Sequence, residues 1–199
     1  MSRKGEHKVK PETWISVDTE TSGPAPGVAS LLSIGAVVVG RPHETFYVEL
    51  RPVPGMGWSE GAEAVHGLSR EHLAADGLDP HEAMTRFADW IAALPGVAAG
   101  ERPIFLEFNT FDWAFVLDYF WRFYGSCPFG ISGLDTKSAY FGLTYPGTTT
   151  FGETVKSVIY ARNGELSTTP HSHNALDDAA GQAELMASML ERARHGTLR

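Results

Sequence analysis

Two acidic side chains, Asp18 and Glu20, follow a short apolar run in the segment "WISVDTETSG". If this run is a β-strand, its period of two places both carboxylates on the same face. Two carboxylates on one face repel each other, so a shared proton, a bound cation or exposure to water must offset the repulsion. The pair therefore indicates either a site for chemistry or a solvated strand end.

Two further acids, Asp112 and Asp178, occur in the segments "FNTFDWAF" and "HSHNALDDAA". Asp112 lies early in a predicted helix, and Asp178 lies about one turn inside the last predicted helix. Strand ends and helix starts are the places where α/β folds collect functional groups. If these acids met the first pair, Mg²⁺ or Mn²⁺ would be suitable partners, because hard cations prefer oxygen ligands. His173 would then suit a base that removes a proton from metal-polarised water.

Several of these residues also have competing explanations. Asp112 could simply favour the positive N-terminal end of its helix. His171 competes with His173 for the role of base, and Asp177 competes with Asp178 for the role of ligand. The five-residue step to Asp178, with Ala175 and Leu176 between, favours His173 over His171. The helical position of Asp177 points its side chain elsewhere, which favours Asp178 as the ligand.

The elements that must position these residues are those of a layered α/β domain. Segments 13–18, 30–40 and 45–52 are predicted strands, and the short connection between the last two favours an antiparallel hairpin. Segment 103–108 is a fourth predicted strand. Helices are predicted near 68–77, 78–96, 110–125, 136–142, 150–159 and 174–194. This order predicts a mixed sheet covered by helices.

The overall composition sets limits on the class of protein. The chain has 199 residues with 43% hydrophobic and 20% charged residues, which suits one globular domain. We expect a single domain over 13–194, with a flexible N-terminal tail (1–12) and a C-terminal tail (195–199). The formal net charge of −8 argues against coating long nucleic acids through a broad basic surface. It does not exclude gripping a short piece of nucleic acid through bound metal.

The compartment is predicted from what the sequence lacks. Cys127 is the single cysteine, so an intramolecular disulfide is excluded. The polar N-terminus is not a secretory signal, and the longest apolar stretch is about half the length that crosses a bilayer. We therefore expect a cytoplasmic protein without membrane contact.

Three segments, "VDTETSG", "FNTFDWAF" and "HNALDDA", resemble in order the motifs of the DEDDh 3′–5′ exonucleases, which include ribonuclease T and the proofreading subunit of bacterial DNA polymerase III. Two more, "AEAVHGLSREHL" and "LDT" at 134–136, are similar to supporting segments of that family. The resemblance covers about residues 13–190. It implies a ribonuclease-H-like α/β fold, which agrees with the three-strand antiparallel meander expected above. It also implies hydrolysis of terminal phosphodiesters of DNA or RNA to nucleoside 5′-monophosphates.

Residue roles follow from this resemblance. Asp18, Glu20, Asp112 and Asp178 would be catalytic acids that bind two Mg²⁺ ions about 3.5–4 Å apart, with Asp18 bridging them and Mn²⁺ able to substitute. His173 would be the catalytic general base. Because a histidine must be neutral to accept a proton, we expect activity to fall below about pH 6.5.

Substrate contacts are expected from Thr21, His66 and Asn109. His66 could instead be a core or turn histidine, and Asn109 could instead cap the following helix. Glu107 and Phe108 replace the family's usual Gly/Ala-His pair, which bears on local substrate contacts. Single-stranded 3′ ends of DNA or RNA are the expected partners. The protein could form a homodimer, and nothing in the sequence supports association with a polymerase.

Two other functions compete with this one. A haloacid-dehalogenase-like phosphatase opens on a D-x-D-x-T motif, but here Glu20 replaces the second aspartate and "HNALDDA" has no role. A non-catalytic nucleic-acid-binding module on an exonuclease fold is the other alternative. Degenerate members usually lose ligands, whereas all five catalytic positions are filled in this chain.

Overall fold

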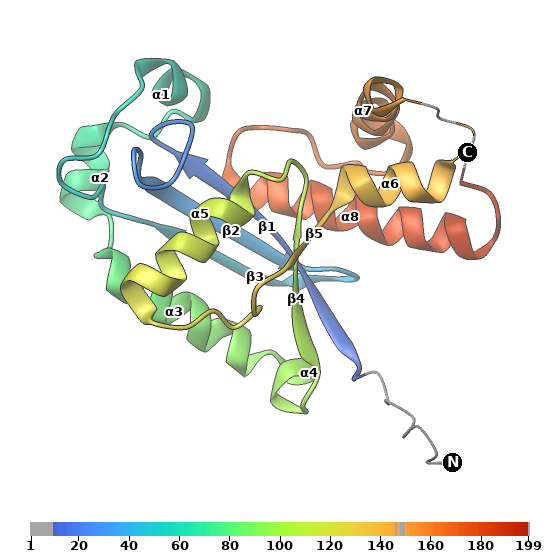
Figure 1. Cartoon of the computed structure of the whole chain (residues 1–199), viewed down its shortest axis with the longest axis horizontal. Coiled ribbons are helices and arrows are strands. Elements are labelled where there is room, and N and C mark those ends of the chain that lie inside the picture. Colours follow the sequence, from blue (N-terminus) through green and yellow to red (C-terminus); the bar gives the residue numbers. More distant parts are fainter. Residues whose placement is uncertain (1–9, 146, 148–149, 199) are drawn as a thin grey trace, which may run out of the picture.

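A five-stranded sheet in the order β3-β2-β1-β4-β5 forms the centre of the computed structural model, which describes residues 10–145, 147 and 150–198. Strands β1, β2 and β3 pair antiparallel, whereas β4 pairs parallel with both β1 and β5 (Figure 1). The predicted mixed sheet with a three-strand antiparallel meander is confirmed. The strands are β1 Glu12–Thr21, β2 Leu31–Val38, β3 Arg41–Glu49, β4 Arg102–Glu107 and β5 Gly133–Asp135.

Helices cover both faces of this sheet (Figure 1). Helix α8 (Ala175–Arg194) packs on β1 and β2, whereas α3 (Pro80–Ala93) and α5 (Asp112–Tyr119) pack on the opposite face. Every residue of β2 is buried because both of its faces are covered. The other helical segments are α1 Glu60–His66, α2 Arg70–Asp76, α4 Pro95–Ala98, α6 Thr136–Thr144, α7 Phe151–Tyr160, and two π-helical turns, η1 Phe120–Tyr124 and η2 Ala161–Glu165.

All six predicted helices are present, but two short helices were missed and the predicted bounds of β1 and β3 were wrong. No helix was predicted over α1, and the predicted helix over 78–96 is divided at Leu94 into α3 and the short α4. Strand β3 begins at Arg41 rather than at 45, because a tight hairpin with Gly40 at φ 77° returns the chain at once. Strand β1 continues to Thr21 rather than ending at 18, because it stays paired with β2. Both acids of the first motif are therefore inside the strand.

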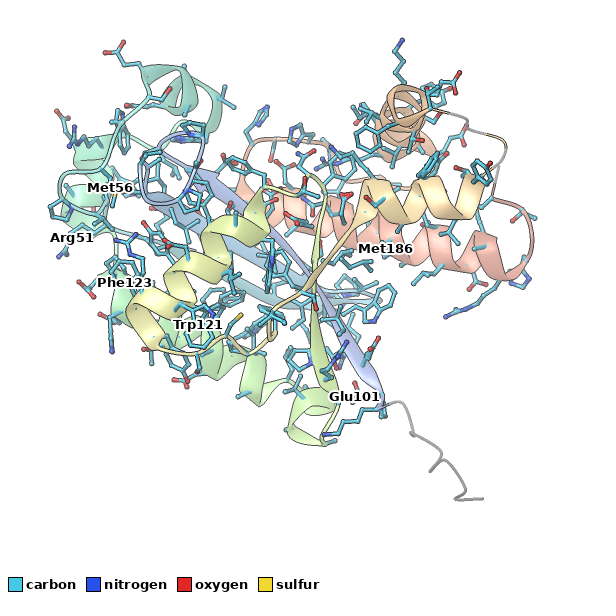
Figure 2. All side chains as sticks on the ribbon, in the orientation of Figure 1. Arg51, Met56, Glu101, Trp121, Phe123 and Met186 are labelled. Atoms are coloured by element: carbon cyan, nitrogen blue, oxygen red, sulfur yellow. The ribbon has the colours of Figure 1, made fainter. Side chains whose placement is uncertain are left out.

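Buried apolar side chains pack on both sides of the sheet, and Figure 2 shows side chains between the strands and the covering helices. The larger cluster joins alternate residues of β1 and β2 to aromatic rings of α3 and α5, such as Phe87 and Phe115. Met186 of α8, labelled in Figure 2, is also buried. A second cluster packs α6, α7 and η2 onto α8 through Phe108, Tyr140, Val158, Leu166, Leu185 and Met189.

The division into one domain and two tails stays a prediction. Residues 1–9 of the predicted N-terminal tail lie outside the described residues, and β1 begins at Glu12. Within the described ranges, no helix has both the length and the apolar character that a membrane span requires.

Candidate active site

One face of β1 carries the first two acids. Residues Ile15 and Val17 point into the core beneath α3 and α5, whereas Ser16 and Asp18 both contact Gln182 of α8. The period of two therefore places Asp18 and Glu20 together on the α8 side, as the sequence predicted. Gln182 is fully buried, and its Nε2 donates a hydrogen bond of 2.6 Å to Asp18 Oδ1.

A glycine lets the start of α8 lie directly on the sheet beside these acids. Gly35 of β2 pairs in register with Asp18. A Cβ atom at Gly35 would lie 2.2 Å from the carbonyl carbon and oxygen of Ala175, the first residue of α8. No side chain fits at such a distance, so the missing side chain permits this approach. One turn later, Asp178 reaches Asp18 and Glu20.

Three carboxylates meet at this point. Asp18, Glu20 and Asp178 each offer an oxygen atom, and these atoms lie within 4.8 Å of one another. Asp112 approaches from α5, and its Oδ1 accepts hydrogen bonds from the backbone nitrogen (2.9 Å) and the hydroxyl (2.7 Å) of Thr19. The structure thus groups three of the four predicted ligands and ties the fourth to the residue between Asp18 and Glu20.

Burial and mutual repulsion leave this cluster poorly suited to carrying several negative charges alone. Burial, with added repulsion from Asp112, Asp178 and Glu20, raises the pKa of Asp18 well above its usual range. Burial also raises the pKa of Glu20 to about 8 and that of Asp112 to about 7. In the described part of the chain, no hydrogen bond reaches the Glu20 carboxylate. A proton or a cation is therefore the group that balances these charges, rather than water.

Asp178 has a different environment, rich in donors. Its Oδ1 lies 3.2 Å from Arg162 Nη2, 2.6 Å from His171 Nδ1 and 3.2 Å from the backbone nitrogen of Ser172. Its Oδ2 accepts a 3.0 Å hydrogen bond from the backbone nitrogen of His173. Only 1% of the side chain is exposed. The protein itself thus supplies hydrogen-bond partners to both oxygens of Asp178.

Both candidate bases lie beside Asp178. The rings of His171 and His173 are exposed and their centroids lie 4.2 Å apart. His173 adopts a left-handed backbone conformation (φ 57°), which is uncommon for a non-glycine residue and often marks functional sites. Asp177 is exposed and bonds the Ser172 hydroxyl at 3.1 Å, away from the three-carboxylate group.

The residues expected to contact substrate lie on three different segments: Thr21 at the end of β1, His66 at the end of α1, and Asn109 between β4 and α5. Thr21 is buried and donates its hydroxyl hydrogen to the Gly23 carbonyl (2.9 Å). His66, at the end of α1, has a pKa lowered by burial and by the nearby His173, and its buried Nε2 has no hydrogen-bond partner in the described chain. Asn109 is exposed and accepts a 2.6 Å hydrogen bond from Lys137 Nζ.

The alternative role of Asn109 as a helix cap is wrong. The start of α5 is instead stabilised by Glu107, whose Oε2 accepts a 3.0 Å hydrogen bond from the backbone nitrogen of Trp113. Glu107 is buried, and burial raises its pKa. The departure from the family pattern at position 107 is thus a structural device of this chain.

Four residues that position the site were not predicted: Thr19, Gly35, Arg162 and Gln182. Gln182 had a signal in the sequence, because it follows Asp178 by four residues and must share its helix face. Thr19 also had one, since its side chain must point away from its two acidic neighbours. The contacts of Gly35 and Arg162 come from tertiary packing.

The chain is similar in sequence to known nucleases. Residues 13–190 match the model of the 3′-5′ exoribonuclease Rv2179c-like domain. The chain belongs to this family of 3′–5′ exonucleases. A 3′-5′ DNA exonuclease of Escherichia coli, Cap18, is 43% identical over 177 residues, covering 87% of this chain and 89% of that protein.

Solved exonuclease structures share the fold. The nuclease domain of 3′hExo, a DEDDh family member bound to rAMP, superposes with a TM-score of 0.72 at 15% identity, covering 94% of each chain. E. coli exonuclease I in complex with a dA16 oligonucleotide gives a TM-score of 0.68 at 14% identity. This chain spans only 42% of exonuclease I, so that likeness concerns one part of the larger protein. The expected α/β exonuclease fold is confirmed.

Proposed function

We propose that this protein hydrolyses the terminal phosphodiester at the 3′ end of DNA or RNA, with divalent metal ions, and releases nucleoside 5′-monophosphates. The observation that carries this proposal is the group of Asp18, Glu20 and Asp178 within 4.8 Å, beside two histidines, in a member of a 3′–5′ exonuclease family. Family membership sets aside the phosphatase alternative. The non-catalytic module stays an outcome of the experiment below.

The donor set fits a hard divalent cation. All three grouped ligands are carboxylates, and the repulsion that raises the pKa values of Asp18 and Glu20 would be relieved by positive charge. We assign Asp18, Glu20, Asp178 and Asp112 to hold two Mg²⁺ or Mn²⁺ ions, with Asp18 central. Bound ions of this kind polarise water and stabilise the negative charge that develops on a phosphate.

The chain's own residues would move the proton. His173 accepts the proton of the attacking water, whose oxygen forms a bond to the terminal phosphorus. The bond from that phosphorus to the 3′-oxygen of the preceding nucleotide breaks, and this oxygen takes a proton from solvent. We expect His173→Ala to lower kcat about 10²–10⁴-fold, the usual range for a general base.

His171 provides the matched control for this assignment. Its Nδ1 contacts Asp178, so its loss weakens the orientation of a ligand rather than removing the base. We expect His171→Ala to lower kcat about 10–100-fold, as for other residues that orient a ligand. The assignment is reversed if His171→Ala proves the more damaging change.

The substrate could carry deoxyribose or ribose. The family description names RNA, whereas the name of the E. coli relative specifies DNA. We propose that Thr21, His66 and Asn109 contact the terminal nucleotide, where a 2′-hydroxyl distinguishes RNA from DNA. Because the solved neighbours include complexes with single oligonucleotide strands, we propose that single-stranded ends are preferred.

The deciding experiment uses 5′-labelled DNA and RNA oligonucleotides, single- and double-stranded, with Mg²⁺, Mn²⁺ or EDTA. We expect stepwise shortening from the 3′ end, release of mononucleotides, and no activity in EDTA or with Asp18→Ala. Absence of metal-dependent turnover on every substrate would favour the non-catalytic module. A cytoplasmic location remains a prediction, a polymerase partner remains without support, and size-exclusion chromatography with light scattering tests whether the protein forms a homodimer.

A further inference from the structure

Two cationic side chains flank an aromatic ring next to the acidic cluster. Phe108 is 5% exposed and anchored in the second core cluster. The guanidinium carbon of Arg162 lies 4.9 Å from the centroid of the Phe108 ring, and Lys137 Nζ lies 5.5 Å from it. Attraction between a cation and an aromatic ring holds both side chains near this ring. Phe108 replaces the histidine usual in the family, so this arrangement belongs to this chain.

Arg162 has hydrogen-bond donors that the protein does not use. Its Nη2 lies 3.2 Å from Asp178 Oδ1 and 3.3 Å from His171 Nδ1. Its Nε is buried and has no hydrogen-bond partner among the described residues, and the side chain is 8% exposed. An arginine carries five N–H donors, and a buried donor without an acceptor is unfavourable. The planar guanidinium matches the oxygens of a phosphate group in particular.

There is room for such a group beside Arg162. A groove of about 630 Å³ adjoins this side chain and extends between η2 and the segment before α8. The backbone of Gly164 and polar side chains, including Asn163 and Thr169, form part of its wall. His171, which contacts Asp178, lines the same groove, so the groove opens next to the acidic cluster.

Lys137 supplies a second cation at a more accessible position. It lies in the first turn of α6 and is partly exposed. Its ammonium donates one hydrogen bond, to the exposed Asn109, and an ammonium has three donors. The chain carries a net charge of −8, so an anionic strand needs local positive charge to approach the acids.

We propose that Arg162 and Lys137, held by Phe108, bind backbone phosphates of the strand next to its scissile terminal linkage. This inference rests on the proposed exonuclease function and adds phosphate-binding residues outside the three motifs. Contacts to phosphates carry no base identity, so both residues would act on every sequence alike. The loss of either should weaken strand binding uniformly and lower its salt dependence.

The test measures binding in a slowed enzyme with its carboxylates intact. Fluorescence anisotropy of a 5′-fluorescein single strand is recorded with the His173→Ala protein and Mn²⁺ over a range of NaCl concentrations. Lys137→Met and Arg162→Lys are each added to this parent. We expect about 10-fold weaker binding for each, and a salt slope lower by about 0.7 for each phosphate that the variant no longer binds.

Controls separate these contacts from folding and from general charge. Arg162→Lys keeps a cation beside Asp178, and Lys137 is partly exposed, so thermal unfolding should be nearly unchanged for both. Lys10→Met is the charge control. Lys10 precedes β1, whereas Asp18 lies toward the other end of that strand, so this variant loses one positive charge but should bind the strand as the parent does.

A phosphate-level measurement completes the test. Strands are used in which one linkage near the 3′ end is an uncharged methylphosphonate, at each linkage in turn. We expect a loss of affinity in the parent at each contacted linkage. In Lys137→Met the loss should disappear only at the linkage that Lys137 contacts, and in Arg162→Lys it should become smaller only at the linkage that Arg162 contacts. Equal losses in parent and variants, with hydrolysis by the wild-type protein intact, would overturn this inference alone. A wild-type protein that neither binds nor hydrolyses any strand would overturn the proposed function and this inference with it.

Discussion

The acids of β1 and the acid of α8 belong to one cluster but are stabilised in opposite ways. Asp178 has the Arg162 guanidinium, two backbone nitrogens and the His171 ring around its oxygens. Glu20 has a pKa raised to about 8, and no hydrogen bond reaches its carboxylate from the described residues. The α8 side of the site is therefore completed by the protein, whereas the β1 side needs a proton or a cation.

This difference shows how part of a metal site can be held in place by the protein without a bound ion. In the α8 half, the buried ion pair with Arg162 and the backbone nitrogens before α8 hold Asp178, a proposed metal ligand, in place. In the β1 half, Asp18 and Glu20 are repelled by the neighbouring carboxylates, and metal binding would relieve this repulsion. We therefore expect substitutions on the two sides to change stability in opposite directions, while both abolish activity.

The largest effect is expected from Asp178→Asn. This change leaves Arg162 buried without its anionic partner, and breaking a buried pair in this way costs about 3–5 kcal/mol. Urea unfolding in EDTA should show this loss of unfolding free energy. Asp177→Asn is the matched control, because that neighbouring carboxylate is exposed. Similar stability of the two variants would mean that the protein does not stabilise the α8 half.

Gly35→Ala tests the contact that joins the two halves. The added methyl group would meet the backbone of Ala175, so α8 must shift away from β1. We expect a loss of about 1–3 kcal/mol of unfolding free energy, together with loss of exonuclease activity. Gly142→Ala in α6 is the control, because its added Cβ meets no atom within 4 Å. Full activity of Gly35→Ala would show that the site tolerates a displaced α8.

The pH dependence of stability in EDTA tests the β1 half, with the smallest expected effect. The pKa of Glu20 is raised from 4.5 to about 8 in the folded protein, so the folded state binds this proton more tightly than the unfolded state. The resulting stabilisation is present at low pH and is lost as the pH rises toward 8. The thermal midpoint should therefore fall by about a few degrees between pH 5 and pH 8. For a chain of this size, each kcal/mol of lost unfolding free energy lowers the midpoint by about 2–4 °C.

Glu20→Gln identifies the residue responsible for this fall. The amide cannot ionise, so the variant should be more stable than the wild type at pH 8 and its midpoint should fall less steeply. Asp18 and Asp112 also have raised pKa values, so part of the fall should remain. An identical pH profile for wild type and variant would refute the assignment to Glu20.

The fold and the identity of the acids were largely readable from the sequence. The two-residue period of a β-strand correctly predicted that Asp18 and Glu20 lie on one face of β1. The apolar pattern correctly predicted the antiparallel meander of β1, β2 and β3. The environment that separates the two halves was not readable. Arg162 reaches Asp178 only because η2 packs against the segment before α8, and Gly35 is an ordinary strand residue until α8 lies on it. Such contacts depend on tertiary packing, which local periodicity does not encode.

The central claim is that the carboxylates centred on Asp18 bind divalent cations. Its most direct test is calorimetric titration of Mn²⁺ at pH 8 into the wild type, Asp18→Asn and Asp177→Asn, each shown to be folded. We predict saturable binding to the wild type and to Asp177→Asn, and loss of that binding in Asp18→Asn. Mn²⁺ binding to Asp18→Asn with wild-type affinity and stoichiometry would contradict the account.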